Sequence, residues 1–299
     1  MWVYRQGGWT NPKTVTDFLA MTRVIVSRYH RQVRYWLTFN EEFFFEFVDQ
    51  GNFPLNAAQT LAMRRNLITA HRRAYDLIHR IEPGAMVSCN YAWPGRGSLA
   101  SIETDPFMKA VAGKLDYVAL DYYYPAYDQL PTLLDLSNGT PWKAQLDPFG
   151  IYTALRSMHR QFPRLPILIT ENGMSTDNGA PRADGITRQE NMRDTLYWVQ
   201  RAIRDRVPVI GYMYWTLVDN YEWGSYNARL GLYTVNVLTD PTLRRRPTAA
   251  VSVYRSLIRG GGVARTFQPV ERTPPSDCAN ASVAPQDRSV CRQAAAPAG

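Results

Sequence analysis

The stretch Pro166-Ile167-Leu168-Ile169-Thr170-Glu171 is a run of apolar and β-branched residues that ends in a carboxylic acid. A second stretch, Val33-Arg34-Tyr35-Trp36-Leu37-Thr38-Phe39-Asn40-Glu41, has the same character far upstream. Such runs are typical of the buried strands of a parallel sheet. The carboxyl end of a strand is where α/β barrels place their active sites, so Glu41 and Glu171 are candidates for catalysis. A single glutamate after a strand is more often a solvated residue of the following loop than a catalytic residue. The surrounding motifs must decide between these two interpretations.

Strand and helix patterns alternate along the chain through five units. Alternating units of this kind permit an open doubly wound sheet or part of a barrel, and periodicity does not choose between them. From Gly260 onward glycines and prolines replace the apolar periodicity, so residues 1–259 are expected to form the folded unit and residues 260–299 a disordered tail. The predicted strands are 33–40, 86–91, 117–123, 167–171 and 209–215, and the predicted helices are 11–30, 56–80, 106–112, 148–162, 188–204 and 248–259.

Composition excludes several classes of partner. The 299 residues are 45% hydrophobic, enough to bury a large core, and the formal net charge is +8. The arginines are scattered along helical stretches with no basic stripe interleaved with exposed aromatics, so no nucleic acid partner is expected. No signal sequence opens the chain and no apolar run is long enough to span a bilayer, so no membrane partner is expected.

The cysteines leave the compartment open. Cys89 lies in a predicted strand and is interpreted as a buried small hydrophobic residue. Cys278 and Cys291 bracket a short polar stretch of the tail and could pair in an oxidising compartment or stay reduced in the cytoplasm. A cytoplasmic location is the default expectation, with secretion as the alternative if an upstream signal belongs to the gene product.

Metal and cofactor motifs are not found in the sequence. The four histidines, His30, His71, His79 and His159, fall in helical stretches without metal-ligand spacing, so they are interpreted as packed or surface residues. Neither a phosphate-binding glycine loop nor a nucleophilic-serine elbow occurs. The sequence therefore predicts no metal and no cofactor.

Motifs around the two glutamates identify a family. Thr38-Phe39-Asn40-Glu41, Ile169-Thr170-Glu171-Asn172-Gly173 and Gly211-Tyr212-Met213-Tyr214-Trp215-Thr216-Leu217-Val218-Asp219-Asn220-Tyr221-Glu222-Trp223 occur in this order. With Gly7-Gly8-Trp9-Thr10-Asn11 and Arg229-Leu230-Gly231-Leu232-Tyr233, they closely resemble the β-glycosidases of glycoside hydrolase family 1. The resemblance covers roughly residues 7–259. It implies a TIM (β/α)8 barrel that hydrolyses terminal β-linked sugars, as a small glycoside or an oligosaccharide, with retention of configuration.

The resemblance implies a catalytic role for each glutamate. Glu171 would be the nucleophile that attacks the anomeric carbon, and Glu41 the general acid that protonates the leaving oxygen and then acts as base toward water. Negative charge on Glu171 disfavours a second charge on Glu41, which would keep Glu41 protonated for its acid step.

Five further residues match the sugar-binding positions of the family. Asn40 matches the residue that contacts the sugar 2-hydroxyl, Tyr123 the residue that orients the nucleophile, and Trp215 the aromatic floor under the sugar ring. Glu222 and Trp223 match the pair that binds the outer hydroxyls. A carboxylate at position 222 would repel a 6-phosphate, which favours unphosphorylated glucosides or galactosides.

Two substitutions depart from the family pattern. Glu42 stands where the family has proline after the acid/base glutamate, and Asp121 stands where it has the asparagine of Asn-Tyr-Tyr. Both add negative charge near the predicted site. Glu42 is expected to point away from it, since neighbouring side chains at the end of a strand face opposite ways.

The five predicted strands correspond to strands four to eight of the family barrel, so the barrel is expected to be incomplete. Two long sheet edges and part of an apolar interior would then face water, which favours self-association or docking of a complementing N-terminal fragment. Two functional classes follow: a retaining β-glycosidase, or a catalytically impaired barrel remnant or glycan-binding module. Only catalysis requires Glu171, so a substitution of that residue distinguishes the two functional classes.

Overall fold

Five parallel strand positions in one row form the centre of the molecule. The structure is a computed structural model that describes residues 2–42, 55–94, 105–124, 130–222 and 224–270. The second position is split, because β2 pairs with β1 and β3 pairs with β4, with Cys89 alone between them. The strands of the row are β1 (Tyr35–Leu37), β2 (Met86–Ser88), β3 (Asn90–Ala92), β4 (Val118–Asp121), β5 (Ile167–Glu171) and β7 (Val209–Tyr212). Every pairing in the row is parallel, as predicted.

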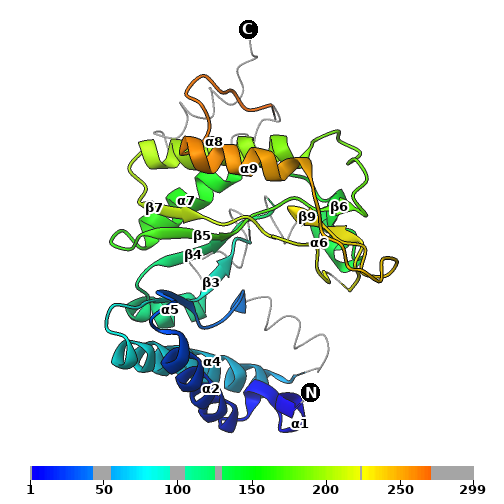
Figure 1. Cartoon of the computed structure of the whole chain (residues 1–299). Helices are drawn as coiled ribbons and strands as arrows, with labels where there is room; N and C mark the ends of the chain where they lie inside the picture. Colours follow the sequence, from blue (N-terminus) through cyan, green and yellow to red (C-terminus); the bar gives the residue numbers. More distant parts are fainter. Residues whose placement is uncertain (1, 43–54, 95–104, 125–129, 223, 271–299) are drawn as a thin grey trace.

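Helices connect successive strands, as parallel pairing requires. Reciprocal capping boxes start two of them, Asn56 with Gln59 and Thr187 with Glu190. In Figure 1, α2 and α4 lie at one end of the row of strands and α8 and α9 at the other. The helices are α1 (Trp2–Arg5), α2 (Lys13–Tyr29), α4 (Ala57–Ile81), α5 (Pro106–Val111), α6 (Leu130–Ser137), α7 (Gly150–Gln161), α8 (Arg188–Arg204) and α9 (Ala249–Gly260), with 3₁₀ turns at Gly8–Thr10, Ala112–Lys114 and Pro141–Lys143.

Several elements differ from the sequence prediction. The first strand covers residues 35–37 instead of 33–40, and the last strand ends at residue 212 instead of 215. In both cases the chain beyond the strand leaves the row to reach the site described below. Helix α6 lies between residues 123 and 148, where no helix or strand is predicted from the sequence. Two antiparallel strand pairs were not predicted, because their strands are only two residues long and give no periodic pattern in the sequence. They are β6 (Thr176–Asp177) with β8 (Ala228–Arg229), and β9 (Tyr233–Thr234) with β10 (Arg246–Pro247).

The main core lies between the strands and the helices. Leu120 of β4 and Ile169 of β5 are fully buried and pack in one cluster with Leu67 of α4, Leu155 of α7 and Ala202 of α8. Burying each large aliphatic side chain contributes roughly 1.5–3 kcal/mol. The middle of the row is therefore the rigid base from which the strand ends project.

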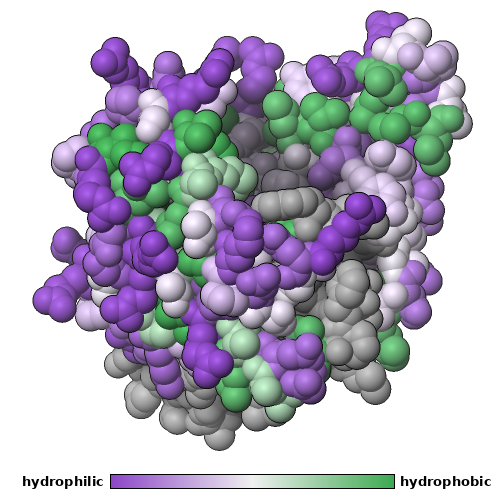
Figure 2. All heavy atoms as spheres, turned by 90° about the horizontal axis from the view of Figure 1, so that it is seen from below, coloured by the Kyte–Doolittle hydropathy of each residue, from purple (hydrophilic) through white to green (hydrophobic). Residues whose placement is uncertain are grey.

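The two ends of the row are open among the described strands. β1 pairs only with β2, and β7 only with β5. Tyr35 and Leu37 of β1 are 42% and 41% exposed, and Ile210 of β7 is 47% exposed. On the side of α2 and α4, apolar side chains such as Met21 and Val24 reach the surface among hydrophilic ones (Figure 2). The described strands thus form a row that is open at both ends, as expected of an incomplete barrel.

The chain after α9 folds back along α8. Phe267 packs against Tyr197, and the backbone N–H of Val270 donates to the carboxylate of Asp194. The tail cysteines, Cys278 and Cys291, lie outside the described residues. None of the helices in the described segments has the length and apolar character that a bilayer crossing requires.

Candidate active site

A cavity of about 140 Å³ opens at the carboxyl ends of the strands. Six predicted site residues lie together on its wall, and they come from the chain after β1, after β4, from β5 and after β7. Trp223, the seventh, lies outside the described residues. The lining residues are Asn40, Glu41, Tyr123, Tyr124, Pro141, Glu171, Ser175, Trp215, Glu222 and Leu230.

Three carboxyl groups lie close together, those of Glu41 and Glu171 on the cavity wall and that of the fully buried Asp121. Oxygen atoms of Glu41, Asp121 and Glu171 all lie within 4.8 Å of one another. At this separation two negative charges repel by on the order of 3 kcal/mol for an effective dielectric constant of about 20. The three groups therefore cannot all be ionised near neutral pH without a large cost, and protons must be shared among them.

The surroundings of Glu41 and Glu171 differ in a way that assigns the proton. Burial, followed by the charges of Glu171 and Glu222, raises the pKa of Glu41 to about 8. Burial also raises the pKa of Glu171, but the Tyr123 hydroxyl opposes this by donating to its Oε2 over 2.8 Å. A hydrogen bond to the ionised form favours that form. The arrangement can hold a neutral acid at position 41 beside an anion at position 171.

A buried amide holds the backbone of Glu41. Glu41 has a φ of 45°, in the left-handed region that costs a residue with a side chain roughly 1–2 kcal/mol. Its N–H donates to Oδ1 of Asn90 over 3.0 Å, and Nδ2 of Asn90 donates to Oδ1 of Asn40 over 2.8 Å. The same Nδ2 donates to Asp121. Sequence reasoning did not select Asn90, although an amide near the end of a buried strand was a signal for it.

Glu42 is buried and does not line the cavity. Its charge acts on Cys89 and Tyr91, whose pKa values are raised first by burial and then by nearby carboxylates that include Glu42. Glu171 and Glu222 are the carboxylates whose charges raise the pKa of Glu41. This agrees with the expectation that Glu42 points away from the cavity.

Trp215 and Glu222 form a hydrogen-bonded pair on the cavity wall. The Nε1–H of Trp215 donates to Oε1 of Glu222 over 2.8 Å, so this bond engages only one of the two carboxylate oxygens of Glu222. The chain at Trp215 passes so close to β5 that a Cβ on Gly173 would lie 2.1 Å from the Trp215 carbonyl oxygen. Glycine after Glu171-Asn172 is therefore required for the chain after β5 and the chain at Trp215 to approach each other.

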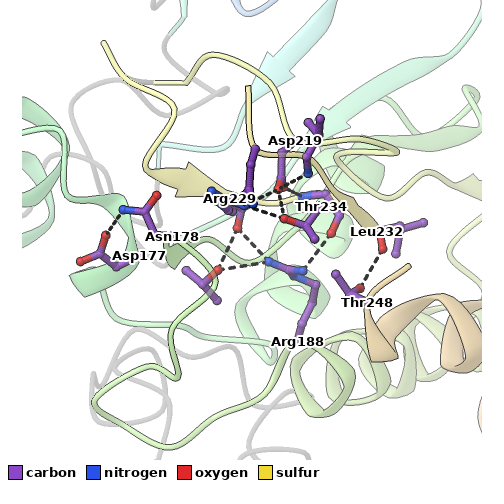
Figure 3. A network of polar contacts seen from close by, with 12 residues as sticks. Asp177, Asn178, Arg188, Asp219, Arg229, Leu232, Thr234 and Thr248 are labelled. Carbon is purple, nitrogen blue, oxygen red and sulfur yellow. Dashed lines mark hydrogen bonds and ion pairs between the residues drawn. The ribbon is translucent and has the colours of Figure 1, made fainter. Parts of the chain in front are cut away.

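A polar network anchors the segment that carries Glu222 (Figure 3). Asp219 accepts hydrogen bonds from the Gly231 N–H and the Thr234 hydroxyl, and its carboxylate lies 3.7 Å from Arg229. Arg188, at the start of α8, donates to the carbonyl oxygens of Gly231 and Arg229 over 2.8 Å each. These bonds tie the loop after β7 to α8 and so fix the position of the Trp215 and Glu222 wall.

One group of acidic side chains in the described residues has the spacing of metal ligands. Oxygen atoms of Glu41, Asp121 and Glu171 are close enough to one another to share a cation. His71, in contrast, is buried between the Thr38 hydroxyl and the Lys114 carbonyl oxygen, at 2.7 and 2.8 Å. Burial lowers the pKa of His71 to about 4, as for a neutral core histidine.

Comparisons with known proteins agree on one family. The family model described as Glycosyl hydrolase family 1 matches residues 2–106 and 95–263. The galactolipid galactosyltransferase SFR2 of Arabidopsis thaliana is 27% identical, over 88% of this chain and 46% of that protein. The β-galactosidase of Sulfolobus acidocaldarius is 27% identical, over 90% of this chain and 63% of that protein. The chain thus spans about half to two thirds of the length of these relatives.

A solved structure shows the same fold. A β-glucosidase from Thermotoga maritima in complex with noeuromycin superposes with a TM-score of 0.70 at 21% identity, over 88% of this chain and 72% of that chain. This likeness confirms that the strands described above are part of a (β/α)8 barrel.

Proposed function

We propose that this chain, which belongs to glycosyl hydrolase family 1, carries the catalytic pair of a retaining β-glycosidase, with Glu171 as nucleophile and Glu41 as acid and base. The observation that carries the proposal is the approach of their carboxylate oxygens to within 4.8 Å. Retaining glycosidases hold the two groups about 5 Å apart, whereas inverting enzymes leave room for a water between them.

In the first step, an oxygen of Glu171 forms a bond to the anomeric carbon as the bond to the glycosidic oxygen breaks. The proton of Glu41 passes to the leaving oxygen, so the aglycone departs as a neutral alcohol. The raised pKa of Glu41 supports this role because it keeps the acid protonated at neutral pH. The Tyr123 hydroxyl orients Glu171 and stabilises its anionic form.

In the second step, Glu41 is ionised and takes a proton from water as the water oxygen attacks the anomeric carbon. Glu171 leaves as a carboxylate, and two displacements restore the original configuration. A sugar hydroxyl in place of water would give glycosyl transfer, the activity named for the relative from Arabidopsis.

The wall formed by Trp215 and Glu222 supports a sugar as substrate. An indole ring offers an apolar face for stacking, and the carboxylate of Glu222 accepts hydrogen bonds from free hydroxyls. The same charge would repel a phosphate, so the expected substrates are unphosphorylated β-glucosides or β-galactosides. Asn40 faces the cavity as the expected contact of the sugar 2-hydroxyl, and Trp223 is proposed beside Glu222 from the sequence motif alone.

The open strand edges support a second candidate, a glycan-binding or catalytically impaired remnant. Within the described residues, β1 and β7 each pair with one strand only, and Leu37 and Ile210 are exposed, which favours pairing with further strands. We propose that a complementing fragment or a second copy of the chain covers these edges. An isolated chain that binds sugars without hydrolysing them would fit this candidate.

Release of nitrophenol from aryl β-glucosides and β-galactosides tests the proposed function. Turnover by the purified chain that disappears in Glu171→Ala supports catalysis by this site. Absence of turnover from well-folded protein that still binds the sugar would favour the binding remnant instead.

A further inference from the structure

A third carboxyl group lies beneath the catalytic pair and is not used in the steps above. Asp121 ends β4 and is fully buried. Its Oδ2 accepts a hydrogen bond from Nδ2 of Asn90, and its Oδ1 lies 2.6 Å from the Thr170 hydroxyl oxygen. Asn90 in turn bonds to the side chain of Asn40 and the backbone of Glu41.

We infer that Asp121 is a protonated carboxylic acid that acts through Asn90 as a positioning residue. Through Asn90 it holds the side chain of Asn40 and the backbone of Glu41 in the positions that the proposed reaction requires. The inference rests on the roles proposed for Glu41 and Glu171. It adds a third residue, one that touches neither the sugar nor the reacting atoms.

The number of protons around Thr170 supports the protonated form. The Thr170 hydroxyl has one proton but lies within hydrogen-bond distance of two oxygens, Oδ1 of Asp121 and, at 3.2 Å, the Leu120 carbonyl. A carbonyl oxygen can only accept. If Asp121 carries a proton on Oδ1, it donates to Thr170, and Thr170 donates to Leu120. Both contacts are then hydrogen bonds at the same time.

The charges around Asp121 point the same way. Glu41, after β1, and Glu171, on β5, each place a carboxylate oxygen within 4.8 Å of it, and Tyr123 lies two residues further along its own strand end. Within the described ranges no lysine, arginine or histidine is bonded to Asp121. Burial, then the charge of Glu171, then that of Glu41 raise the pKa of Asp121 well above its ordinary value.

Asn90 transmits the position of Asp121 to the catalytic acid. Both protons of its Nδ2 are used, one by Asp121 and one by Asn40, so Oδ1 must face the Glu41 N–H. Since Oδ1 of Asn40 accepts from Asn90, the Nδ2 group of Asn40 is left for the cavity that Asn40 lines. An ionised Asp121 would accept from Asn90 as well, but it would add a negative charge next to Glu171.

Infrared difference spectroscopy tests the protonation without relying on activity. The spectrum of the wild-type chain minus that of Asp121→Asn at neutral pH is expected to show the carbonyl stretch of a protonated carboxyl. Carboxylate bands in its place would overturn the inference. Thr170→Val, which removes the partner of the proton, is expected to shift this band, whereas the matched change Thr22→Val in α2 is expected to leave it in place.

Kinetics test the positioning. Asp121→Ala is expected to lower kcat by on the order of tenfold or more, because the support of Glu41 is lost. Asp121→Asn is expected to recover most of this loss, since a carboxamide accepts from Asn90 and donates to Thr170 as the protonated acid does. Equal losses in the two variants would overturn the inference.

The two proposals fail in distinguishable ways. If the wild-type chain shows no turnover, the proposed function fails, while the infrared band of Asp121 is still measurable. The positioning is then read from the protonated-carboxyl band of Glu41, assigned with Glu41→Gln. This band should titrate alike in wild type and Asp121→Asn and differently in Asp121→Ala, and identical titration in all three would contradict the inference.

Discussion

The two glutamates proposed as the catalytic pair are held by different means. Glu171 ends β5, which pairs with a strand on each side, and its side chain receives a hydrogen bond from Tyr123. Glu41 follows β1, which has one neighbour among the described strands, and its left-handed backbone is held by the side chain of Asn90. The proposed nucleophile is therefore positioned by the sheet itself, and the proposed acid by a side-chain network at the edge of the sheet.

The largest expected effect comes from removing the nucleophile. Glu171→Ala should lower kcat for an aryl β-glucoside by on the order of 10⁴-fold or more, because no other group can form the covalent intermediate. Glu82→Ala, at the end of α4, is the matched control and should retain turnover. Azide should restore turnover in Glu171→Ala and give a glycosyl azide of inverted configuration, since one displacement then replaces two. Full activity of Glu171→Ala without azide would break the assignment.

Next in size is the difference in stability between the two strands. Leu168 of β5 is 6% exposed and Leu37 of β1 is 41% exposed. Leu168→Ala should lower the free energy of unfolding by about 2–5 kcal/mol, through lost burial and a residual cavity. Leu37→Ala should cost less than about 1 kcal/mol. Urea denaturation of both variants measures the difference. Equal losses would mean that the β1 edge is covered in solution.

The sequence predicted the interior strand better than the edge. β5 was located residue for residue, because an apolar run buried on both sides is a strong signal. The strand before Glu41 was predicted too long, since its last residues leave the sheet to meet Asn90. Asp121 was noticed as a departure from the family, but its bonds to Asn90 and Thr170 depend on side chains from three strands. No local pattern encodes such contacts.

A smaller effect is expected on the pH dependence. Glu41 must be protonated in the first step, so kcat/KM should fall as the pH rises through about 8, the raised pKa of Glu41. The charge of Glu222 contributes to that shift, so Glu222→Gln should move this basic limb to lower pH. Profiles of kcat/KM against pH for both proteins provide the measurement. A basic limb that moves to higher pH in Glu222→Gln would contradict the electrostatic account of the acid.

The smallest effect is expected at Glu42. Its charge acts on Cys89 and Tyr91, which do not line the cavity, so Glu42→Gln should leave both limbs of the pH profile where they are. A shift of either limb would mean that Glu42 acts directly on the catalytic pair. The proposed catalytic pair would then interact with Glu42 in addition to Asp121 and Glu222.

Covalent trapping tests the central claim most directly. A 2-deoxy-2-fluoro glycoside with a good leaving group slows the second step of a double displacement more than its formation, so the glycosyl enzyme accumulates. The account predicts a mass increase of one sugar on the intact chain, located by peptide mapping at Glu171 and absent in Glu171→Ala. A well-folded chain that gains no label, or gains it at another residue, would contradict the account.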